Sequence, residues 1–432
     1  MSKCKYHHIC GLDVALNLMD EYQAEDSCIL HSKNSRKLQN NKDYEEFAEA
    51  LKRHRKERSQ YAENFAFMFF PREADFHRNI FDKEVSFDQA TFLQGANFYG
   101  ARFIKKAFFG KVTFMGKTSF EGVTFAHDVN FSETRFTERT NFFMATFAKE
   151  ASFSRAVFER GADFSWVTFA EGVGFSGATF LGKTLFTHKK SEVFDDYLAA
   201  LQHLPGPIFS KVEADFREVN IEPPDAVTFR DADLRKCRFL DTDMRKVRLT
   251  GVQWPQIGRR LGVYDEIYAS ESEDAPPWER LEQLYRQLKQ NYEDQHDYER
   301  AGDFHYGEKE MRRKKPETPW GLRLLLVFYW LFSGYGERML RPILWTLGLS
   351  VVCAVAYLCD PSLKEAIPGN LTSGKNPTWG EVAIYSFQVT AFFRPQDFGL
   401  SAWAKVIYTL QSLLGPLLLG LFALAVRQKL KR

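Results

Sequence analysis

The chain has 432 residues and a formal net charge of +2, so it has room for two or three domains and its overall charge rules out no partner. Residues 1–20 contain no apolar run long enough for a signal peptide, and we expect the N-terminus to stay in the cytoplasm. Apolar residues concentrate after Trp320, where we expect membrane segments. The sequence offers no catalytic constellation, so we do not expect an enzyme.

Cysteine and histidine side chains gather near the N-terminus, where half of the six cysteines lie. The spacing from Cys28 to His31 suits two ligands of one tetrahedral ion, and a short segment without its own core gains stability from a metal. We therefore predict that residues 1–40 hold a structural zinc ion. The predicted ligands are Cys4, Cys10, Cys28 and His31. His7 or His8 is an alternative to Cys4, and reduced thiols without metal are the alternative to the whole site.

Residues 41–75 are expected to form a helical cap. Tyr44, Phe47, Ala48 and Leu51 have the spacing of one helical face, and an aromatic patch follows at residues 65–70. Such a helix commonly covers the open end of a solenoid, which would otherwise expose its core.

Phenylalanine then recurs from residue 76 to residue 186 at alternating steps of five and six residues. Two positions before almost every Phe stands Ala, Val or Thr, as in Ala96-Asn97-Phe98. Residues two apart share a face on an extended chain but not on a helix, and the glycines and β-branched residues also oppose a long helix. The spacing therefore predicts a solenoid of extended segments.

This pattern resembles the pentapeptide repeats. The resemblance implies a right-handed, quadrilateral β-helix over residues 76–256, in which the small residue and the Phe point inward and each coil contains four repeats. Here a coil would have two steps of five residues and two of six, which enlarges two of the four corners. Some members of that family present an acidic, DNA-like surface. This repeat has nearly balanced charges, so we expect no such surface and no nucleic-acid partner.

Two stretches of the repeat need separate interpretation. Residues 177–184 match the phosphate-loop pattern, but Ala178, Phe180 and Thr184 are in the inward frame of the repeat, so we expect solenoid rather than a nucleotide site. The repeat breaks after Phe186, and we predict a helical insertion at about residues 187–207. A basic part follows at residues 229–249 with strict steps of five; it is either a solvated face or a surface near anionic lipid or another subunit.

The last third of the chain is predicted to form helices, some of which lie in a membrane. Residues 277–316 are predicted to form a cytoplasmic helical hairpin, and residues 317–336 an interfacial helix too short to span. Residues 338–432 are predicted to contain two spans, from Pro342 to Cys359 and from Ala402 to Val426. Basic clusters precede the first span and follow the second, which places both termini in the cytoplasm and the protein in the plasma membrane.

The connection between the spans contains an apolar stretch at residues 379–393 that is too short to cross the bilayer. This layout resembles the potassium-channel-like pore domain that some bacterial pentapeptide-repeat proteins carry at the C-terminus. Residues 386–390 match the end of that family's pore helix, and Leu414-Gly415 matches the glycine region of its inner helix. The resemblance implies a pore and filter at Thr390, Phe393, Arg394, Pro395, Gln396 and Asp397, and a hinge at Gly415 and Pro416.

The filter departs from the family's pattern. Arg394-Pro395-Gln396-Asp397 stands where the family has a Gly-Tyr-Gly-Asp-type strand, so potassium selectivity is not carried over. The sequence thus predicts a poorly selective ion channel that assembles as a homo-oligomer, a tetramer by the resemblance. Its expected partners are membrane lipid, permeating ions and a protein on the β-helix. The alternative is a membrane-tethered interaction scaffold that does not conduct.

Overall fold

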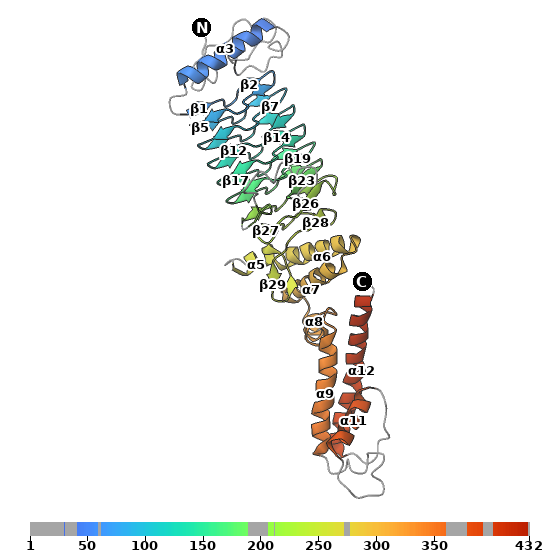
Figure 1. The fold of residues 1–432 in the computed structure, drawn as a ribbon. Coiled ribbons are helices and arrows are strands. Elements are labelled where there is room, and N and C mark those ends of the chain that lie inside the picture. Colours follow the sequence, from blue (N-terminus) through green and yellow to red (C-terminus); the bar gives the residue numbers. More distant parts are fainter. Residues whose placement is uncertain are drawn as a thin grey trace, which may run out of the picture. The chain divides into compact units, whose positions relative to one another are not determined.

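The computed structural model describes residue 30 and residues 41–58, 62–188, 206–210, 212–271, 277–359, 378–391 and 401–430. The chain divides into two compact units, residues 1–291 and residues 292–432. Figure 1 shows the strands in the first unit and the long helices α9 (Leu340–Leu358) and α12 (Ala402–Leu430) in the second.

The first unit contains a parallel β-solenoid of about eight turns, whose strands form four parallel sheets. The first sheet contains β1 (Ala62–Asn64), β5 (Glu84–Ser86), β9 (Ala107–Phe108), β13 (Val129–Asn130), β17 (Ala151–Ser152), β21 (Val173–Gly174), β24 (Ala214–Asp215) and β27 (Cys237–Arg238). The second contains β2 (Phe69–Phe70), β6 (Thr91–Phe92), β10 (Thr113–Phe114), β14 (Arg135–Phe136), β18 (Val157–Phe158), β22 (Thr179–Phe180) and β25 (Asn220–Ile221). The third contains β3 (Ala74–Asp75), β7 (Ala96–Asn97), β11 (Thr118–Ser119), β15 (Thr140–Asn141), β19 (Ala162–Asp163), β23 (Thr184–Thr187), β26 (Val227–Arg230) and β28 (Arg248–Thr250). The fourth contains β4 (Ile80–Phe81), β8 (Arg102–Phe103), β12 (Thr124–Phe125), β16 (Thr146–Phe147) and β20 (Thr168–Phe169).

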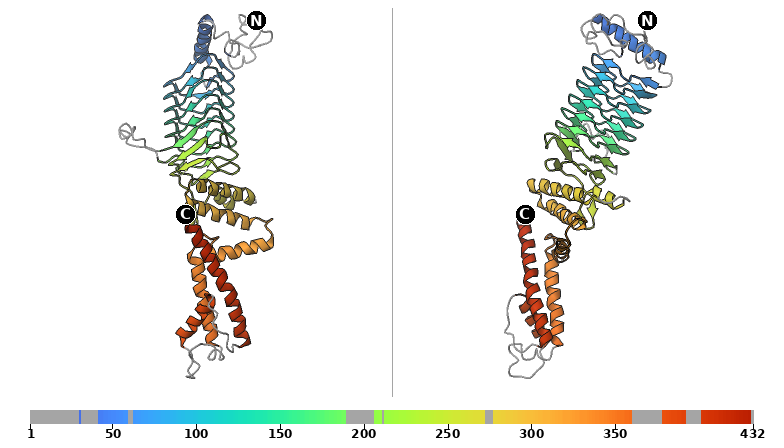
Figure 2. Two further views of the ribbon diagram at one scale, coloured as in Figure 1. Left: turned by 90° about the vertical axis from the view of Figure 1, so that its right-hand side faces the viewer. Right: turned by 180° about the vertical axis from the view of Figure 1, so that it is seen from behind.

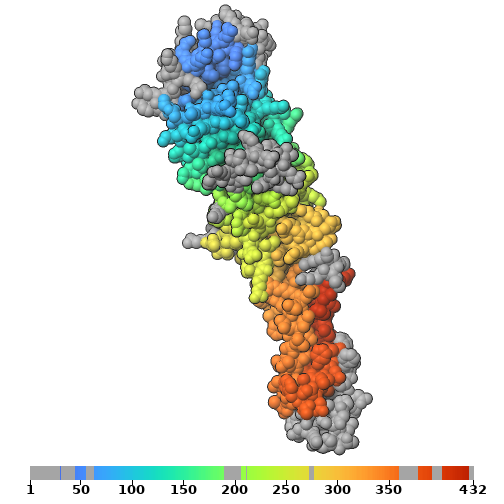
Figure 3. All heavy atoms as spheres, in the orientation of Figure 1, coloured from blue at the N-terminus to red at the C-terminus, as the bar shows by residue number. Residues whose placement is uncertain are grey.

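Consecutive strands enter the four sheets in turn as far as β23, so each strand pairs with the one a full turn later. Partners lie 22 residues apart over most of the solenoid, as in the contact between Gly110 and Asp88. Near the end Phe229 pairs with Leu249, which corresponds to four steps of five. Both coil lengths agree with the spacing of the sequence. The turns follow one another in chain order along the solenoid (Figures 2 and 3).

The core of the solenoid consists of stacked phenylalanine rings. Phe131 is fully buried, and its ring lies 4.7 Å from that of Phe109 and 5.0 Å from that of Phe153, nearly parallel to both. Burying one such ring contributes about 1.5 to 3 kcal/mol relative to leaving it exposed. The inward Phe positions predicted from the sequence are therefore confirmed.

The two kinds of step produce two kinds of corner. At a five-residue step the chain makes a tight turn, such as the one closed by the hydrogen bond from the Ala90 amide to the Phe87 carbonyl, 2.9 Å long. From Phe76 to Phe186 the third residue of these turns has positive φ, for example Gln89 at 59° and Gly100 at 63°. Glycine adopts this conformation without strain, whereas another residue costs roughly 1 kcal/mol. The six-residue steps form the wider corners.

The solenoid begins earlier than the predicted boundary at residue 76. β1 starts at Ala62, and Phe65 and Phe70 already stack on the next turn, 4.8 and 4.4 Å from the rings of Phe87 and Phe92. The expected helical cap is limited to α3 (Asn41–Arg58). Its Phe47 ring contacts Phe70 at 6.0 Å, so the helix covers the first turn of the core.

The predicted insertion at about residues 187–207 lies largely outside the described residues. Where the chain is described again, Phe209 stacks on Phe169 at 5.7 Å and restores a ring to the core. The residues of the phosphate-loop pattern form part of the solenoid: Phe180 and Thr184 are fully buried in strands β22 and β23, and the Thr184 hydroxyl donates to the Gly182 carbonyl.

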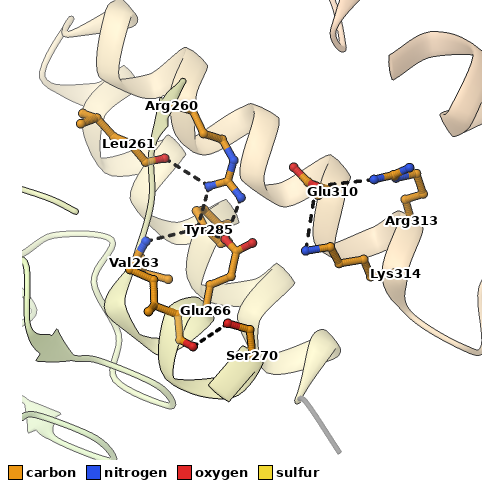
Figure 4. Close-up of polar contacts among 10 residues, drawn as sticks. Arg260, Leu261, Val263, Glu266, Ser270, Tyr285, Glu310, Arg313 and Lys314 are labelled. Atoms are coloured by element: carbon orange, nitrogen blue, oxygen red, sulfur yellow. Dashed lines mark hydrogen bonds and ion pairs between the residues drawn. The ribbon is translucent and has the colours of Figure 1, made fainter. Parts of the chain in front are cut away.

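A small subdomain follows the last turn of the solenoid, and of its elements the sequence predicted only the last helix. It comprises the antiparallel strands β29 (Gln256–Ile257) and β30 (Arg260–Leu261) and the helices α5 (Tyr264–Glu271) and α6 (Trp278–Asp294). The buried Arg260 guanidinium donates to Glu266 and to the Tyr285 hydroxyl, 2.7 and 2.8 Å away, and Tyr285 donates to Glu266 (Figure 4). Burial opposes the charged form of Arg260, but Tyr285 and Glu266 hold its pKa above the ordinary value.

Asp265 joins this subdomain to the last turn. Its carboxylate accepts hydrogen bonds from the backbone amides of Phe239 and Leu240, 2.9 and 3.2 Å away. Burial nevertheless raises the pKa of Asp265 to about 6, although those amides and Arg238 act in the opposite direction. The subdomain that covers the end of the solenoid is thus attached to the last turn by a buried carboxyl group.

The second unit is helical. Its helices, among the described residues, are α7 (Tyr298–Lys314), α8 (Trp320–Ser333), α9, α11 (Trp379–Thr390) and α12. Helices α6 and α7 lie within the range predicted for a hairpin, 277–316, and α8 lies within 317–336. α8 ends at Gly334, whose left-handed conformation, with φ of 56°, stops the helix.

Candidate functional site

Two described helices, α9 and α12, are long and apolar enough to cross a membrane, whereas α8 is too short. Their apolar side chains are not packed inside the unit: Leu344 and Val352 on α9 are 66% and 67% exposed, and Leu413 on α12 is 66% exposed. A large exposed apolar surface indicates contact with lipid or with another protein.

Helix α11 lies against these two helices (Figures 1 and 2). Its start is fixed by a capping box, in which Thr378 accepts from the Glu381 amide and Glu381 accepts from the Thr378 amide. With 12 residues it is about 18 Å long, well short of a bilayer core of about 30 Å. This is the short helix predicted between the spans, and it ends at Thr390.

One face of α11 packs into an apolar cluster at the ends of the long helices. Val382, Tyr385 and Val389 recur at helical spacing and contact α9 and α12. The Tyr385 ring meets that of Tyr357 at 5.5 Å, edge to face. The N-terminal half of α11 is therefore held beside the end of α9 and the beginning of α12.

The C-terminal end of α11 lies much further along both long helices. The Thr390 hydroxyl is 2.9 Å from that of Ser350, near the middle of α9. A β-carbon at Gly415, near the middle of α12, would lie 2.3 Å from the Thr390 carbonyl oxygen. Only glycine permits this approach, so α11 enters beside the helix ends and stops at their midpoint.

A buried polar network fixes this arrangement. The fully buried Gln411 of α12 donates to the Ser386 carbonyl and to the Thr390 hydroxyl, both 2.7 Å away. Its amide oxygen accepts from the Tyr357 hydroxyl at 2.8 Å, and Ser386 donates to the Ser350 carbonyl at 2.7 Å. Polar groups that satisfy one another in this way hold apolar helices in one register.

The structure brings together only some of the predicted site residues. Thr390 and Gly415 are in direct contact, and Pro416 lies inside the continuous helix α12. The remaining predicted pore residues, Phe393, Arg394, Pro395, Gln396 and Asp397, lie outside the described residues. Gln411, Ser350 and Tyr357 were not predicted from the sequence; the available signal was a polar side chain within an otherwise apolar helix.

The predicted zinc ligands Cys4, Cys10, Cys28 and His31 also lie outside the described residues, so the metal prediction stays open. Within the described ranges, no group of three or more His, Cys, Asp or Glu residues is placed to hold a metal.

Comparison with known proteins bears on the repeat. The family model of pentapeptide repeats, with eight copies, matches residues 226–253. No curated protein and no solved structure matches the chain. The matched residues coincide with the last turns of the solenoid, where the step is strictly five. The chain therefore contains pentapeptide repeats, and the match carries no information about the helical unit.

Proposed function

We propose that the protein is an oligomeric ion channel of the plasma membrane, with α9 and α12 as its spans and the solenoid as a cytoplasmic part that binds a partner or senses a signal. The observation that carries the proposal is the position of α11, which ends at the midpoint of both long helices. A simple membrane anchor has no need of such a helix.

The physical argument concerns the backbone. The last four carbonyl groups of a helix have no partner within it. At the middle of a bilayer such groups must face protein or water, because lipid cannot accept or donate hydrogen bonds. Ile384 and Phe387 on the outer face of α11 are 61% and 49% exposed, so one copy does not enclose the helix. Several copies around an axis would shield these side chains and leave a water-filled path at the helix ends.

The ion preference follows from two opposing charges. The C-terminal end of a helix carries about half a negative charge, which favours a cation at the centre. Arg394, just beyond that end, stays protonated and would oppose cations unless it pairs with Asp397. We expect a poorly selective pore lined by Thr390, Phe393, Arg394, Pro395, Gln396 and Asp397, with Gly415 and Pro416 as the hinge of α12.

The proposal also covers the form of the β-helix, the location of the termini and the oligomeric state. Four sheets visited in turn support a quadrilateral β-helix, and its right-handed sense is proposed from the resemblance to the pentapeptide repeats. Arg312–Lys315 before the spans and the basic residues after them support cytoplasmic termini, although Arg313 and Lys314 also contact Glu310 (Figure 4). A tetramer fits the resemblance to the potassium-channel-like pore. No enzymatic activity is proposed.

The test is the reversal potential of the purified protein in a bilayer under a potassium chloride gradient, for the wild type and for Arg394→Glu. We expect a small reversal potential in the wild type and a shift toward cation preference in the variant. A wild-type pore strongly selective for potassium over sodium and chloride would contradict the proposed filter. Absence of current under every condition would favour the scaffold.

Zinc at Cys4, Cys10, Cys28 and His31 is a separate proposal, supported by the spacing of these residues. Protein purified without chelator is expected to contain about one zinc ion per chain, because these residues supply the four ligands of a structural site. Cys28→Ser should lose the metal, whereas Cys359→Ser, at an exposed cysteine far along the chain, should retain it. Elemental analysis decides, and metal-free wild-type protein would reject the site.

A further inference from the structure

A groove of about 500 Å³ runs along the first sheet of the solenoid, from Lys106 to Arg238. Its floor is formed by outward-facing residues on six successive strands, β9, β13, β17, β21, β24 and β27. Five spacings of about 4.8 Å make the groove about 24 Å long. An extended chain of seven or eight residues, at roughly 3.1 to 3.3 Å per residue, has this length.

The groove is widened by two glycines that the backbone does not require. Gly172 and Gly174 lack positive φ, and an added β-carbon would meet no atom closer than 3.9 and 3.5 Å, respectively. At Gly161, by contrast, a β-carbon would lie 2.1 Å from the Lys183 carbonyl oxygen. Glycine in a strand lowers stability, and it marks places where another backbone approaches closely. The two glycines therefore indicate room for a bound chain.

One wall of the groove carries carboxylates at a fixed interval. The strands that directly follow Glu150, Gly172 and Glu213 pair with one another in register. These three residues therefore occupy the same position on three consecutive turns. Glu150 and Glu213 are thus two turns, or about 9.6 Å, apart. Among the described residues Glu150 forms no ion pair, whereas Asp128 on the preceding turn is neutralised by Lys106 at 3.3 Å. The wall presents exposed negative charge on both sides of Gly172.

Helix α5 closes one end of the groove. The Tyr264 hydroxyl donates to Glu213 at 3.0 Å, and the Arg238 guanidinium stacks on the Tyr268 ring at 3.8 Å. Burial and the hydrogen bond to Glu213 raise the pKa of Tyr264 to about 12, so its proton stays in place at neutral pH. Glu213 is therefore held in position, and in the described part of the chain its carboxylate accepts no other hydrogen bond.

We propose that this groove binds an extended basic segment of a partner protein, in the polyproline II conformation and with Lys or Arg at every third position. That helix has three residues per turn and rises about 3.1 Å per residue, so every third side chain returns to the same side after about 9.3 Å. This repeat matches the interval between Glu150 and Glu213, while Gly172 and Gly174 accommodate the main chain. The inference rests on the proposed partner-binding role of the solenoid and not on conduction.

The test measures binding of a fluorescent peptide of three Lys-Pro-Pro units to the full-length protein in detergent by fluorescence anisotropy. Binding is expected and should weaken as salt is added. Glu150→Gln and Glu213→Gln should each weaken it about threefold, as for an exposed ion pair, and together about tenfold. Gly174→Gln should fill the floor and weaken binding by at least about tenfold. Thr146→Gln, a matched change on the fourth sheet, should have no effect.

Two controls separate specific binding in the groove from unfolding of the variant and from non-specific charge attraction. Unchanged melting of Gly174→Gln would show that the solenoid is intact, as expected from the ordinary 3.5 Å contact that a β-carbon there would make with Ser154. A peptide of the same composition with its three lysines adjacent should bind more weakly than the spaced one. Equal affinity for both peptides, undiminished binding to Gly174→Gln, or no binding at low salt would each overturn the proposal. Because no step involves current, a silent pore leaves this result unaffected.

Discussion

The solenoid and the helical unit use polar and apolar groups in opposite ways. In the solenoid, rings such as Phe131 fill the interior, and backbone hydrogen bonds join one turn to the next, as from the Phe109 amide to the Asn130 carbonyl. In the helical unit, the backbone hydrogen bonds lie within each helix. The polar side chain of Gln411 is buried there, whereas the apolar side chain of Leu344 is exposed. The solenoid distributes its stability over many equivalent residues, whereas the geometry of α11 depends on a few particular ones.

The largest effect is expected from removing a ring at the centre of the solenoid. Phe131→Ala should lower the free energy of unfolding by about 3 to 5 kcal/mol, because a cavity replaces a fully buried side chain. The measurement is chemical denaturation of residues 1–291, the first compact unit. Ser132→Ala, which loses a single half-buried contact with Ser152, should cost less than about 1 kcal/mol. Equal losses of unfolding free energy in the two variants would contradict a core stabilised by the phenylalanine rings.

A change of pH should weaken the closed end of the solenoid by a comparable amount. The pKa of Asp265 is about 6 in the folded unit and near 3.8 when unfolded, so its stabilising effect is complete below 3.8 and is lost as pH rises through 6. The difference corresponds to at most about 3 kcal/mol. Between pH 4 and pH 7 the wild type should lose that much more stability than Asp265→Asn. Parallel pH profiles for the two proteins would refute a protonated native Asp265.

The helical unit should respond to a single added carbon. Gly415→Ala places a β-carbon 2.3 Å from the Thr390 carbonyl, so α11 and α12 must separate, at a cost of about 1 to 3 kcal/mol. Gly420→Ala, with open space around the same atom, is the matched control. Melting in detergent is expected to fall for Gly415→Ala alone, and any current should fall with it. Equal behaviour of the two variants would place α11 elsewhere.

The smallest effect is expected from the polar network. Gln411→Leu removes the donors to the Ser386 carbonyl and the Thr390 hydroxyl and should cost about 1 to 2 kcal/mol. Ser412→Ala, one residue on and half-buried, loses only a hydrogen bond to the Thr409 carbonyl within its own helix and should be neutral within about 0.5 kcal/mol. Melting in detergent measures both. An unchanged Gln411→Leu would show that apolar packing alone holds α11.

The fold was predictable where a pattern repeats. The phenylalanine period specified the inward rings and both coil lengths. It missed the first turn because Glu63 and Met68 stand where small residues precede most rings. The closing subdomain was also missed, except for α6, since Arg260, Glu266 and Asp265 are charged residues whose burial depends on partners distant in sequence.

The candidate site was predictable only in outline. The length of the apolar stretch from residue 379 gave a short helix between two spans, and the helix ends at Thr390 rather than at residue 393. Thr390 and Gly415 were proposed from the resemblance, and their contact explains why glycine is needed there. Gln411 escaped notice because one amide in an apolar helix has no periodic signature, and its importance appears only when three helices are assembled.

The tight corners also constrain how such a protein can change length during evolution. Residues with positive φ recur every eleven positions, at alternate corners, as at Gln89, Gly100 and Lys111. Loss of eleven residues would move every later strand to the opposite sheet, whereas loss of a whole turn of 22 would return each strand to its own sheet. Duplication or deletion of whole turns in the gene can therefore lengthen or shorten the solenoid while both closed ends keep their sequences.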